Sequence, residues 1–459
     1  MAPVVHVAIP LCPLVWTRRG CLTPGMTDPL LSLYDAAIRG ADPADATAQA
    51  IDQLRIPRER GVLIFAMGKA ASSMATAAVA VLLKSLHRIV GGVMVTPDGD
   101  RSPYPTVLSV KGDHPIPGPN SFAAAEKIAD AAKGRRATDV VIVLVSGGAS
   151  SLVAAPLQGQ KTADLVNLYQ LLLASGLDIA AVNTVRKRFS RWGGGRLAQA
   201  LAPAAVHCLA VSDVPGNDLG AIGSGPCAPD PANASDVLSI LEKEKLVSRV
   251  APVYLEYLKS VTRGVTGETP KARHPAFAHV TSRVVASNRS ALDHAASTAA
   301  AQGMRVEIVE DQLVGSAAAA GESIARRLIA ASNTRDGAAK CILWGGETTV
   351  ATDATTSMTA GGRCQELALA AARVLGDAGE RASRVRLLAA GTDGRDGITE
   401  AAGAMVDFKT WAAITAAGTD PATALLKHES NRALSAANAL VPRRRTGTNV
   451  MDVAIGIVD

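Results

Sequence analysis

The hydrophobic residues of this chain are concentrated in short unbroken runs, each followed by small or polar residues. The most regular run, 140–145, reads VVIVLV and contains only apolar, mostly β-branched residues. Such a run predicts a strand that is buried on both faces, as in a parallel sheet. Similar runs predict strands at 62–67, 91–96, 206–211, 284–287, 305–309, 341–344 and 386–390.

Between these runs, apolar residues return with the spacing of a helix. The pattern predicts two helices on either side of Gly40, and others near 69–86, 122–133, 162–175, 178–192, 317–332 and 365–375. Strands that alternate with helices are typical of an α/β fold. A polar stretch at 257–277 predicts the boundary between a first domain at 26–270 and a smaller second domain at 271–459.

The first 25 residues do not fit this pattern. Pro10 and Pro13 interrupt their apolar run, and Arg18 and Arg19 follow the run, whereas an export signal carries its positive charges before it. We therefore expect Met26 to be the functional start and residues 1–25 to be a disordered or artefactual extension.

The loop after the central run, Ser146-Gly147-Gly148-Ala149-Ser150-Ser151, has the composition of an anion-binding turn. Glycines let backbone N–H groups approach a phosphate, hydroxyls add donors, and a helix that starts near Ser150 would direct its positive end there. A tight turn without a ligand is the alternative. We call residues 146–151 the cradle.

Polar loops of the same kind follow five other predicted strands, which makes the ligand-free alternative less favourable. Open α/β sheets bind ligands just outside the carboxyl ends of their strands. Loops of this kind in both domains therefore predict a polar cleft between the domains. The loops contain Gly68 and Lys69; Asp213, Asn217 and Asp218; Asn288; Glu347; and Asp393 and Asp396.

The side chains expected in this cleft favour phosphoryl transfer. Cations (Lys69, Arg186, Arg363) and carboxylates accompany the glycine-rich loops, and no Ser-His-Asp set is evident. Transfer of a phosphoryl group needs cationic clamps and carboxylates for Mg²⁺, for which Asp213 and Asp393 are the candidates. Each residue also has a simpler alternative, because Asp393 and Asp396 could cap turns and Arg186 could be a surface charge.

The chain contains no convincing dinucleotide or Walker A motif. Lys69 lacks the upstream glycine of GxxxxGK[ST], and the G-x-G-x-x-A match at 193–198 follows a predicted helix. A second match at 223–228 has Pro226 where an N–H should face the pyrophosphate. A nicotinamide-dependent reaction is therefore disfavoured.

Composition limits the classes of binding partner and the cellular compartment that we expect. The net charge of +6 is spread along the chain without an aromatic-rich basic stripe, which favours small anions over nucleic acid. No run of 18 apolar residues is present, so no membrane span is expected. The six cysteines lack CxxC pairs and histidines at metal-ligand spacing, which indicates reduced thiols in the cytoplasm.

Taken together, the motifs resemble those of the class II glycerate kinases, the glycerate 2-kinase family with a C-terminal MOFRL-type domain. The resemblance implies a Rossmann-like parallel-sheet N-terminal domain, a smaller α/β MOFRL-type domain, and an interdomain active-site cleft. It also implies ATP-dependent phosphorylation of D-glycerate to 2-phosphoglycerate with Mg²⁺. The matching stretches are GKAASSM (68–74), HPIP (114–117), SGGASSL (146–152), NTVRKRFS (183–190), SDVPGNDLGAIGSGP (212–226), GGETTV (345–350), GGRCQELAL (361–369), GTDGRDGITEAAGA (391–404) and TGTNVMD (446–452).

By this resemblance, Lys69 and Arg363 are the residues expected to be central to catalysis. Asp213 and Asp393 are the candidates for the base that accepts the proton of the 2-hydroxyl group. The sequence leaves open whether the protein forms a homodimer. The residues expected to bind substrate or nucleotide are Gly68, Ser146, Gly147, Gly148, Ser150, Ser151, Asn183, Arg186, Asp213, Asn217, Asp218, Asn288, Glu347, Asp393, Asp396 and Asn449.

The chain departs from the family pattern at two places. Gly193 replaces a lysine, for which Arg191 or Arg196 could substitute, and Pro442 to Arg445 replace a glycine and a proline. Two alternatives to the kinase therefore stay open. One is a hydroxypyruvate reductase, a name that members of the family have carried, and the other is a catalytically silent nucleotide-binding protein.

Overall fold

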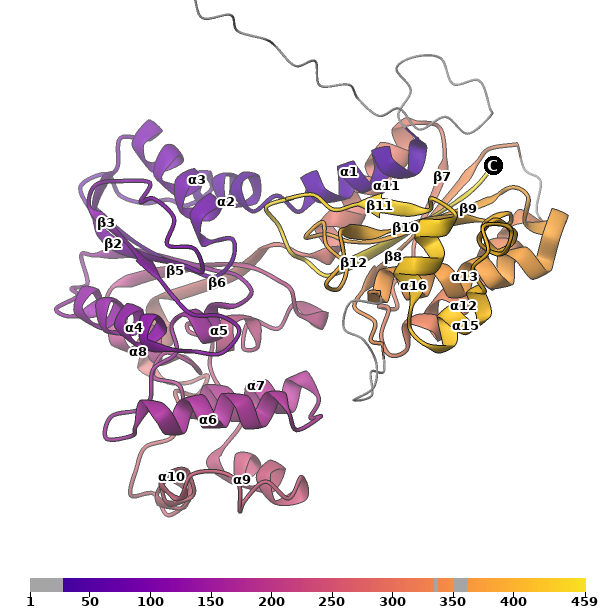
Figure 1. Cartoon of the computed structure of the whole chain (residues 1–459). Coiled ribbons are helices and arrows are strands. Elements are labelled where there is room, and N and C mark those ends of the chain that lie inside the picture. Colours follow the sequence, from indigo (N-terminus) through magenta and orange to yellow (C-terminus); the bar gives the residue numbers. More distant parts are fainter. Residues whose placement is uncertain (1–27, 334–336, 351–360) are drawn as a thin grey trace, which may run out of the picture.

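The computed structural model describes residues 28–333, 337–350 and 361–459. The extension expected at residues 1–25 lies outside them. The described chain forms two lobes, each built around one sheet of six strands (Figure 1).

The sheet of the first lobe is entirely parallel, with the strand order β3-β2-β1-β4-β5-β6. This is the doubly wound order of a Rossmann-like domain, as the sequence resemblance predicted. Strand β4 is buried along its whole length, because helices cover both faces of the sheet. The strands are β1 (Gly61–Met67), β2 (Arg88–Thr96), β3 (Val107–Lys111), β4 (Val140–Val145), β5 (Ala205–Val211) and β6 (Val280–Ala286).

Two sets of helices cover this sheet. Helices α2 (Pro43–Asp52) and α3 (Ala71–Lys84) pack on one face. Helices α4 (Pro119–Ala132), α5 (Ala149–Leu152) and α8 (Arg196–Leu201) pack on the other. Short 3₁₀ turns follow β5 at Pro215–Asn217 and Ile222–Ser224, and another precedes β6 at Pro275–His279.

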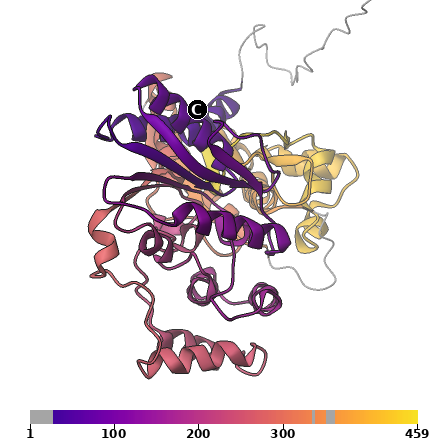
Figure 2. The same ribbon diagram turned by 90° about the vertical axis from the view of Figure 1, so that its left-hand side faces the viewer.

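Four further helices form a layer below the sheet with a hydrophobic cluster of their own (Figure 2). Phe189 and Tyr254 meet in this cluster with their ring centroids 4.3 Å apart. The expected polar boundary at 257–277 starts inside the last of these helices. They are α6 (Thr162–Leu173), α7 (Ile179–Phe189), α9 (Ala234–Lys243) and α10 (Pro252–Thr262).

The sheet of the second lobe is mixed, with the order β11-β10-β9-β12-β8-β7, and only β7 and β8 run parallel as neighbours. The last strand lies in its middle and sends alternate residues to opposite faces, as strand geometry requires. The strands are β7 (Arg305–Ile308), β8 (Lys340–Gly346), β9 (Val385–Gly391), β10 (Ala401–Asp407), β11 (Leu440–Pro442) and β12 (Asp452–Val458).

Helices also cover both faces of the second sheet. Helices α1 (Pro29–Gly40) and α11 (Asn288–Ala301) lie on one face. Helices α12 (Ala317–Ser332) and α13 (Arg363–Ala378) lie on the other, with α14 (Thr410–Ala416), α15 (Pro421–Leu426), α16 (Ser430–Ala436) and a 3₁₀ turn at Gly379–Ala382 around them. Among the described residues, no helix combines the length and the apolar composition that a membrane crossing requires.

The chain crosses between the lobes twice, after α1 and after β6, and both crossings differ from the expected domain limits. Helix α1 packs against α11 in the second lobe, and β6 extends the first sheet beyond residue 270 by pairing with β5. A Cβ on Gly40 would lie 2.3 Å from the Cβ of His294, so glycine permits the close approach of α1 and α11. Hydrophobic spacing in α1 predicts that it needs an apolar partner, but not which lobe supplies one.

Candidate active site

The first half of the site lies where the strand order reverses, between β1 and β4. The helices after these two strands leave to opposite faces of the sheet, which is the arrangement that opens a ligand crevice. The two loops are bonded together: the backbone N–H of Lys69 donates to the carbonyl of Gly147 (2.9 Å). Gly68 has a φ of +127°, and a Cβ there would lie 2.1 Å from the Ser146 hydroxyl, so glycine is required.

The serines of the cradle bond to protein atoms. Ser146 Oγ accepts from the N–H of Ala70 (3.0 Å), and Ser151 Oγ donates to the carbonyl of Pro115 (2.6 Å). Ser150 Oγ lies 2.7 Å from Ser224 Oγ. In this structure the hydroxyls fix the shape of the loop, whereas the sequence suggested donors for an anion. Direct contact of Ser146, Ser150 and Ser151 with a ligand stays a prediction.

Two basic side chains, Lys69 and Arg186, act on His114 beside the cradle. The His114 ring lies 3.0 Å, and Lys69 Cγ 3.5 Å, from the position that a Cβ on Gly148 would take. Partial burial, followed by the positive charges of Lys69 and Arg186, lowers the pKa of His114 to about 4. His114 is therefore neutral at pH 7, and Lys69 and Arg186 supply the positive charge here.

Asp213 follows β5 and packs against the cradle. A Cβ on Gly147 would lie only 2.0 Å from Asp213 Oδ2. Burial raises the pKa of the Asp213 carboxyl; the charge of Lys69 opposes this shift, and the charge of Glu347 adds to it. Farther along the same loop, Asn217 adopts a positive φ of 56°, and Asp218 is exposed and caps a turn by accepting from the N–H of Gly220 (2.8 Å).

The second half of the site is centred on Arg363 at the start of α13. Asp452 Oδ1 accepts from its Nη2 (2.8 Å), Asp452 Oδ2 accepts from its Nε, and Glu347 Oε1 lies 2.9 Å from its Nη1. Burial alone would lower the pKa of this guanidinium, but the two carboxylates raise it above its ordinary value. Arg363 is therefore charged and held by two carboxylates, of which Glu347 is the more exposed.

Asp452 was not among the residues expected from the sequence. The strand register pairs it with Gly346 at the end of β8 and with Gly391 at the end of β9, so it lies where both strands end. Burial raises the pKa of Asp452 to about 6 against the lowering effect of Arg363. The available signal was a carboxylate that opens a strand of otherwise uncharged residues, DVAIGIV.

Four other expected residues of the second lobe have structural partners. Asp396 is buried and caps α13 by accepting from the N–H groups of Cys364 (3.1 Å) and Gln365 (2.8 Å). Asn288 donates to the carbonyls of Val450 (2.9 Å) and Asp452 (2.8 Å), and so fixes the start of β12.

Asp393 is exposed and caps a turn through the N–H of Arg395 (3.0 Å). This matches the turn-capping alternative and uses Oδ1 of the carboxylate. Asn449 accepts from the N–H of Met451 (3.3 Å) within its own loop. Ligand contacts of these residues stay predictions.

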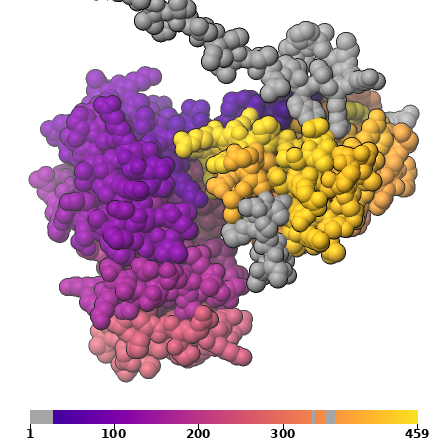
Figure 3. Space-filling model, viewed as in Figure 1, coloured from indigo at the N-terminus to yellow at the C-terminus, as the bar shows by residue number. Residues whose placement is uncertain are grey.

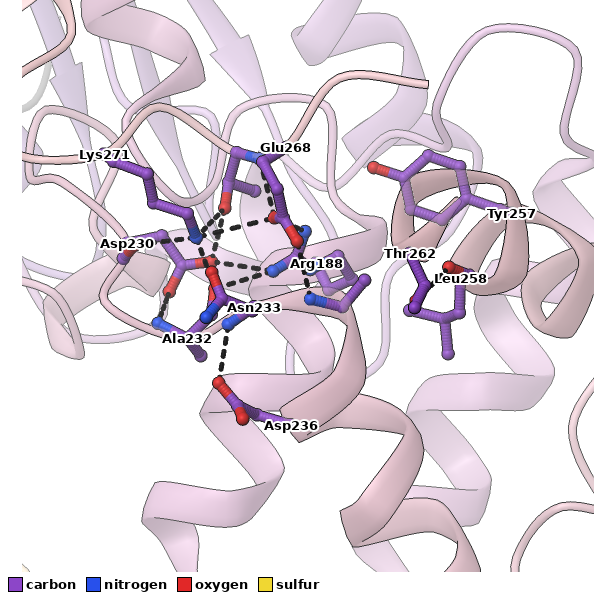
Figure 4. Close-up of polar contacts among 12 residues, drawn as sticks. Arg188, Asp230, Ala232, Asn233, Asp236, Tyr257, Leu258, Thr262, Glu268 and Lys271 are labelled. Atoms are coloured by element: carbon purple, nitrogen blue, oxygen red, sulfur yellow. Dashed lines mark hydrogen bonds and ion pairs between the residues drawn. The ribbon is translucent and has the colours of Figure 1, made fainter. Parts of the chain in front are cut away.

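Helix α7, which carries Asn183 and Arg186, is anchored by a buried charge network on its other residues (Figure 4). Arg188 is completely buried, pairs with Glu268, and lies 3.6 Å from Asp230; Lys187 Nζ lies 3.4 Å from Asp230. Removing one partner of such a buried pair leaves an uncompensated buried charge, which is strongly destabilising. The network therefore holds α7 in one orientation, with Asn183 nearly buried.

The two places that depart from the family pattern also have structural partners. Arg196 donates to backbone carbonyls, among them that of Ser190 (3.0 Å), and Arg191 pairs with Glu126 and stacks on Trp192. Neither arginine is therefore available to replace a lysine at position 193.

At the second departure from the family pattern, residues 442–445, Cζ of Arg444 lies 4.6 Å from the centroid of the Tyr34 ring, and its guanidinium pairs with Asp35. Its N–H donates to the carbonyl of Gly394 (3.1 Å), and Tyr34 donates to the carbonyl of Gly391 (2.6 Å). The replaced segment thus joins α1 to the loop after β9.

The two halves of the site are linked electrostatically. Lys69 and Glu347 both shift the pKa of Asp213, and Glu347 pairs with Arg363. Figure 3 shows the lobes in contact in the upper part of the view and diverging below it. Among the described residues, no group of three His, Cys, Asp or Glu side chains is gathered for a metal.

The fold and this site define a two-lobed α/β protein with charged loops at the strand ends of both sheets. Residues 29–259 match the family model described as "Domain of unknown function (DUF4147)", and residues 340–452 match the MOFRL family. The D-glycerate 2-kinase of Thermotoga maritima is 35% identical over 93% of this chain and 97% of its own length. The crystal structure of glycerate kinase from the same organism has a TM-score of 0.81 at 35% identity, covering 94% of this chain and 99% of that one.

Of two other relatives, one is named as a kinase and one as a reductase. The glycerate 2-kinase of Pyrococcus horikoshii is 33% identical over 93% of this chain and 96% of its own length. A protein of Agrobacterium vitis with a provisional hydroxypyruvate reductase name is 37% identical over 92% of both chains. The chain belongs to the glycerate 2-kinase family with a C-terminal MOFRL domain, which confirms the resemblance seen in the sequence motifs.

Proposed function

We propose that this protein is an ATP-dependent glycerate 2-kinase, which transfers the γ-phosphoryl group of ATP to the 2-hydroxyl of D-glycerate. The observation that carries the proposal is that each lobe places a basic side chain among the loops at its strand ends: Lys69 beside the cradle, and Arg363 held by Asp452 and Glu347. Positive charge from both lobes can stabilise a phosphoryl group during transfer, because negative charge spreads over its oxygens. The relatives named glycerate 2-kinase support the choice of substrate.

In this reaction the 2-hydroxyl oxygen forms a bond to the γ-phosphorus, and the bond from that phosphorus to the β–γ bridging oxygen breaks. ADP leaves with the electron pair, and the hydroxyl proton passes to a base. Asp213 is the better candidate for the base, because its raised pKa makes it a stronger proton acceptor than an ordinary carboxylate. Asp393 is more exposed and already caps a turn.

Magnesium fits the donor set, because it is commonly bound by one or two carboxylates together with substrate phosphates. Asp393 is the carboxylate proposed to hold it when Asp213 serves as the base, and Asp213 is the alternative ligand. When bound, the ion neutralises phosphate charge. Lys69 and Arg363 supply the remaining positive charge from the protein.

The hydroxypyruvate reductase alternative is favoured only by the name that some relatives carry. The turn after β1 is Gly68-Lys69-Ala70 and not a dinucleotide fingerprint. The two G-x-G-x-x-A matches lie between α7 and α8 and around the 3₁₀ turn Ile222–Ser224, so neither joins a strand to a helix.

One pair of assays tests the proposal and its alternatives. Purified protein is given D-glycerate, ATP and Mg²⁺, and ADP release is measured with enolase added to detect 2-phosphoglycerate directly. A parallel reaction measures NADH and NADPH oxidation with hydroxypyruvate. We expect stoichiometric ADP release and an enolase-competent product. Hydroxypyruvate-dependent oxidation without ADP release would establish the reductase, and nucleotide binding without either reaction would establish the silent protein.

We infer a cytoplasmic location and keep a homodimer as part of the proposal. The described cysteines, Cys208, Cys227, Cys341 and Cys364, are all buried free thiols, which fits a reducing compartment. Light scattering of the purified protein tests the dimer through its molar mass.

A further inference from the structure

Arg186 in α7 is placed by an aromatic ring and not by a carboxylate. Its Cζ lies 4.7 Å from the centroid of the Tyr169 ring. Its Nε is buried and has no hydrogen-bond partner among the described residues, where no carboxylate pairs with its guanidinium either. A buried charged donor without a partner costs free energy, so this guanidinium has the features of one that binds an anionic ligand.

Tyr169 connects Arg186 to the cradle. Its hydroxyl donates to the carbonyl of Ser150 (3.0 Å), while its ring face lies against the guanidinium. The charges of Arg186 and Lys69 both lower the pKa of His114, whose ring lies against the position of a Cβ on Gly148. Arg186 and Lys69 are therefore two cations that act on one space beside the cradle.

Neighbouring residues of α7 keep Arg186 in position. Lys187 is held by Asp230. Arg188 is held by Asp230 and Glu268 in the network of Figure 4. The helix start is also fixed, because Asp178 accepts from the N–H of Ala181 (2.8 Å). A side chain on such a helix can be pre-organised for its ligand, which is what substrate positioning requires.

The kinase reaction brings two different anions to these two cations. The planar guanidinium of arginine matches a carboxylate with two parallel hydrogen bonds, whereas a lysine ammonium acts as a point charge on phosphate. Lys69 follows β1 at the crevice where the strand order reverses, which is where a phosphate is expected.

We infer that Arg186 binds the carboxylate of the acceptor and restricts the acceptor to 2-hydroxy carboxylates, while Lys69 is left to the phosphoryl group. The inference rests on the proposed kinase function.

The test compares Arg186→Gln and Arg186→Lys with the full-length wild-type enzyme. In Arg186→Gln, kcat/KM for D-glycerate is expected to fall by about 10²-fold, the cost of losing a bidentate charged contact, while KM for ATP changes little. Arg186→Lys should recover only part of this loss, because it keeps the charge without the planar fork. Arg191→Gln is the matched control, because Arg191 also stacks on an aromatic ring (Trp192) but pairs with Glu126.

A neutral acceptor separates carboxylate binding from a merely structural role. D-glyceramide keeps the hydroxyl groups of D-glycerate and lacks the carboxylate charge. We expect the preference of the wild type for D-glycerate over D-glyceramide to shrink by about 10²-fold in Arg186→Gln. Equal losses with both acceptors would overturn the inference, as would a raised KM for ATP with an unchanged KM for D-glycerate.

Calorimetry distinguishes failure of this inference from failure of the kinase proposal. If the wild type releases no ADP with D-glycerate, the kinase proposal fails, but D-glycerate can still be titrated into wild type and Arg186→Gln without nucleotide. Binding to the wild type that is lost in Arg186→Gln and kept in Arg191→Gln supports the carboxylate site. Absence of binding to the wild type, or equal binding to Arg186→Gln, overturns it.

Discussion

At the level of single residues, the basic side chains of the site differ in how neighbouring residues orient them. Arg363 is oriented by Asp452 and Glu347, and Arg186 is oriented by Tyr169. Lys69 is exposed, and among the described residues no carboxylate forms an ion pair with it. The two residues expected to be catalytic thus differ, since one is held by carboxylates and the other is not.

Replacement of either expected catalytic residue should slow turnover without unfolding the protein. Lys69→Ala and Arg363→Ala are each expected to lower kcat by about 10²-fold or more, because each removes charge stabilisation from the transition state. Steady-state kinetics with D-glycerate and ATP measures the effect, and circular dichroism checks the fold. Near-normal turnover in both variants would show that the assignment is wrong.

The raised pKa of Asp452 predicts a pH dependence of turnover. Below about pH 6, Asp452 takes up a proton and loses the charge that orients Arg363, so kcat should fall. A pH profile of kcat measures this acid limb, which Asp452→Asn should remove at the cost of a lower plateau. An unchanged acid limb in Asp452→Asn would contradict the assignment.

The same group makes a stability prediction of opposite sense. Its pKa is higher in the folded state than the ordinary value of 3.8, so its favourable contribution is present below that value and is lost as the pH rises through about 6. The thermal midpoint of Asp452→Asn relative to wild type should therefore improve between pH 4 and pH 7. Scanning calorimetry at several pH values provides the comparison.

Site residues that follow a buried strand could be predicted from the sequence more readily than site residues whose position depends on pairing between distant parts of the chain. Lys69 and Asp213 follow buried strands directly, which the sequence makes visible. Asp452 escaped notice because its partner Arg363 is 89 positions away and its pairing depends on the register of β12. Asn288 drew attention because it follows a predicted strand, but its amide is used by the backbone of β12.

At the scale of elements, the strand ends determine where the chemistry lies. The expected strands correspond to β1, β2, β4, β5, β6, β7, β8 and β9, because short runs rich in apolar residues are visible directly in the sequence. β12 was not anticipated because Ala454 and Gly456 weaken its hydrophobic pattern. Its position between β8 and β9 depends on tertiary pairing, which the local sequence does not reveal. For the same reason, the local sequence does not show that α1 packs on the second lobe.

The close packing of the cradle on the loop after β5 predicts a sharp steric effect. In Gly147→Ala the new Cβ would lie 2.0 Å from Asp213 Oδ2, so Asp213 must move. A displacement of about 1 Å at a reacting group can cost about 10²-fold in rate, which is the loss of kcat expected here. The matched control is Gly267→Ala, where nothing lies within 4 Å of the new Cβ, and its kcat should be unchanged.

At the scale of the whole molecule, two short crossings join lobes that each carry half of the site. The crossings at Gly40–Asp42 and Ala286–Asn288 border a groove of about 490 Å³ that is lined by residues of α1, α2, β6 and α11. Domains joined in this way commonly move relative to each other, and closure of such lobes can complete a site and exclude water.

Substrates that contact both lobes should therefore compact the molecule. We expect the radius of gyration in solution to decrease when D-glycerate, Mg²⁺ and a non-hydrolysable ATP analogue are added together. X-ray scattering measures the change, and Arg363→Ala, which lacks the contact from the second lobe, serves as the control. A radius that does not respond to the substrates would argue against closure.

Lys69 and Arg363, from separate lobes, are proposed to act on one phosphoryl group. A crystal structure of the enzyme with D-glycerate, Mg²⁺ and a non-hydrolysable ATP analogue tests this proposal most directly. We expect Lys69 Nζ and a guanidinium nitrogen of Arg363 within hydrogen-bond reach, about 3 Å, of oxygens on the γ-phosphoryl group. A γ-phosphoryl group bound by one lobe alone, with the other side chain facing a different surface, would contradict it.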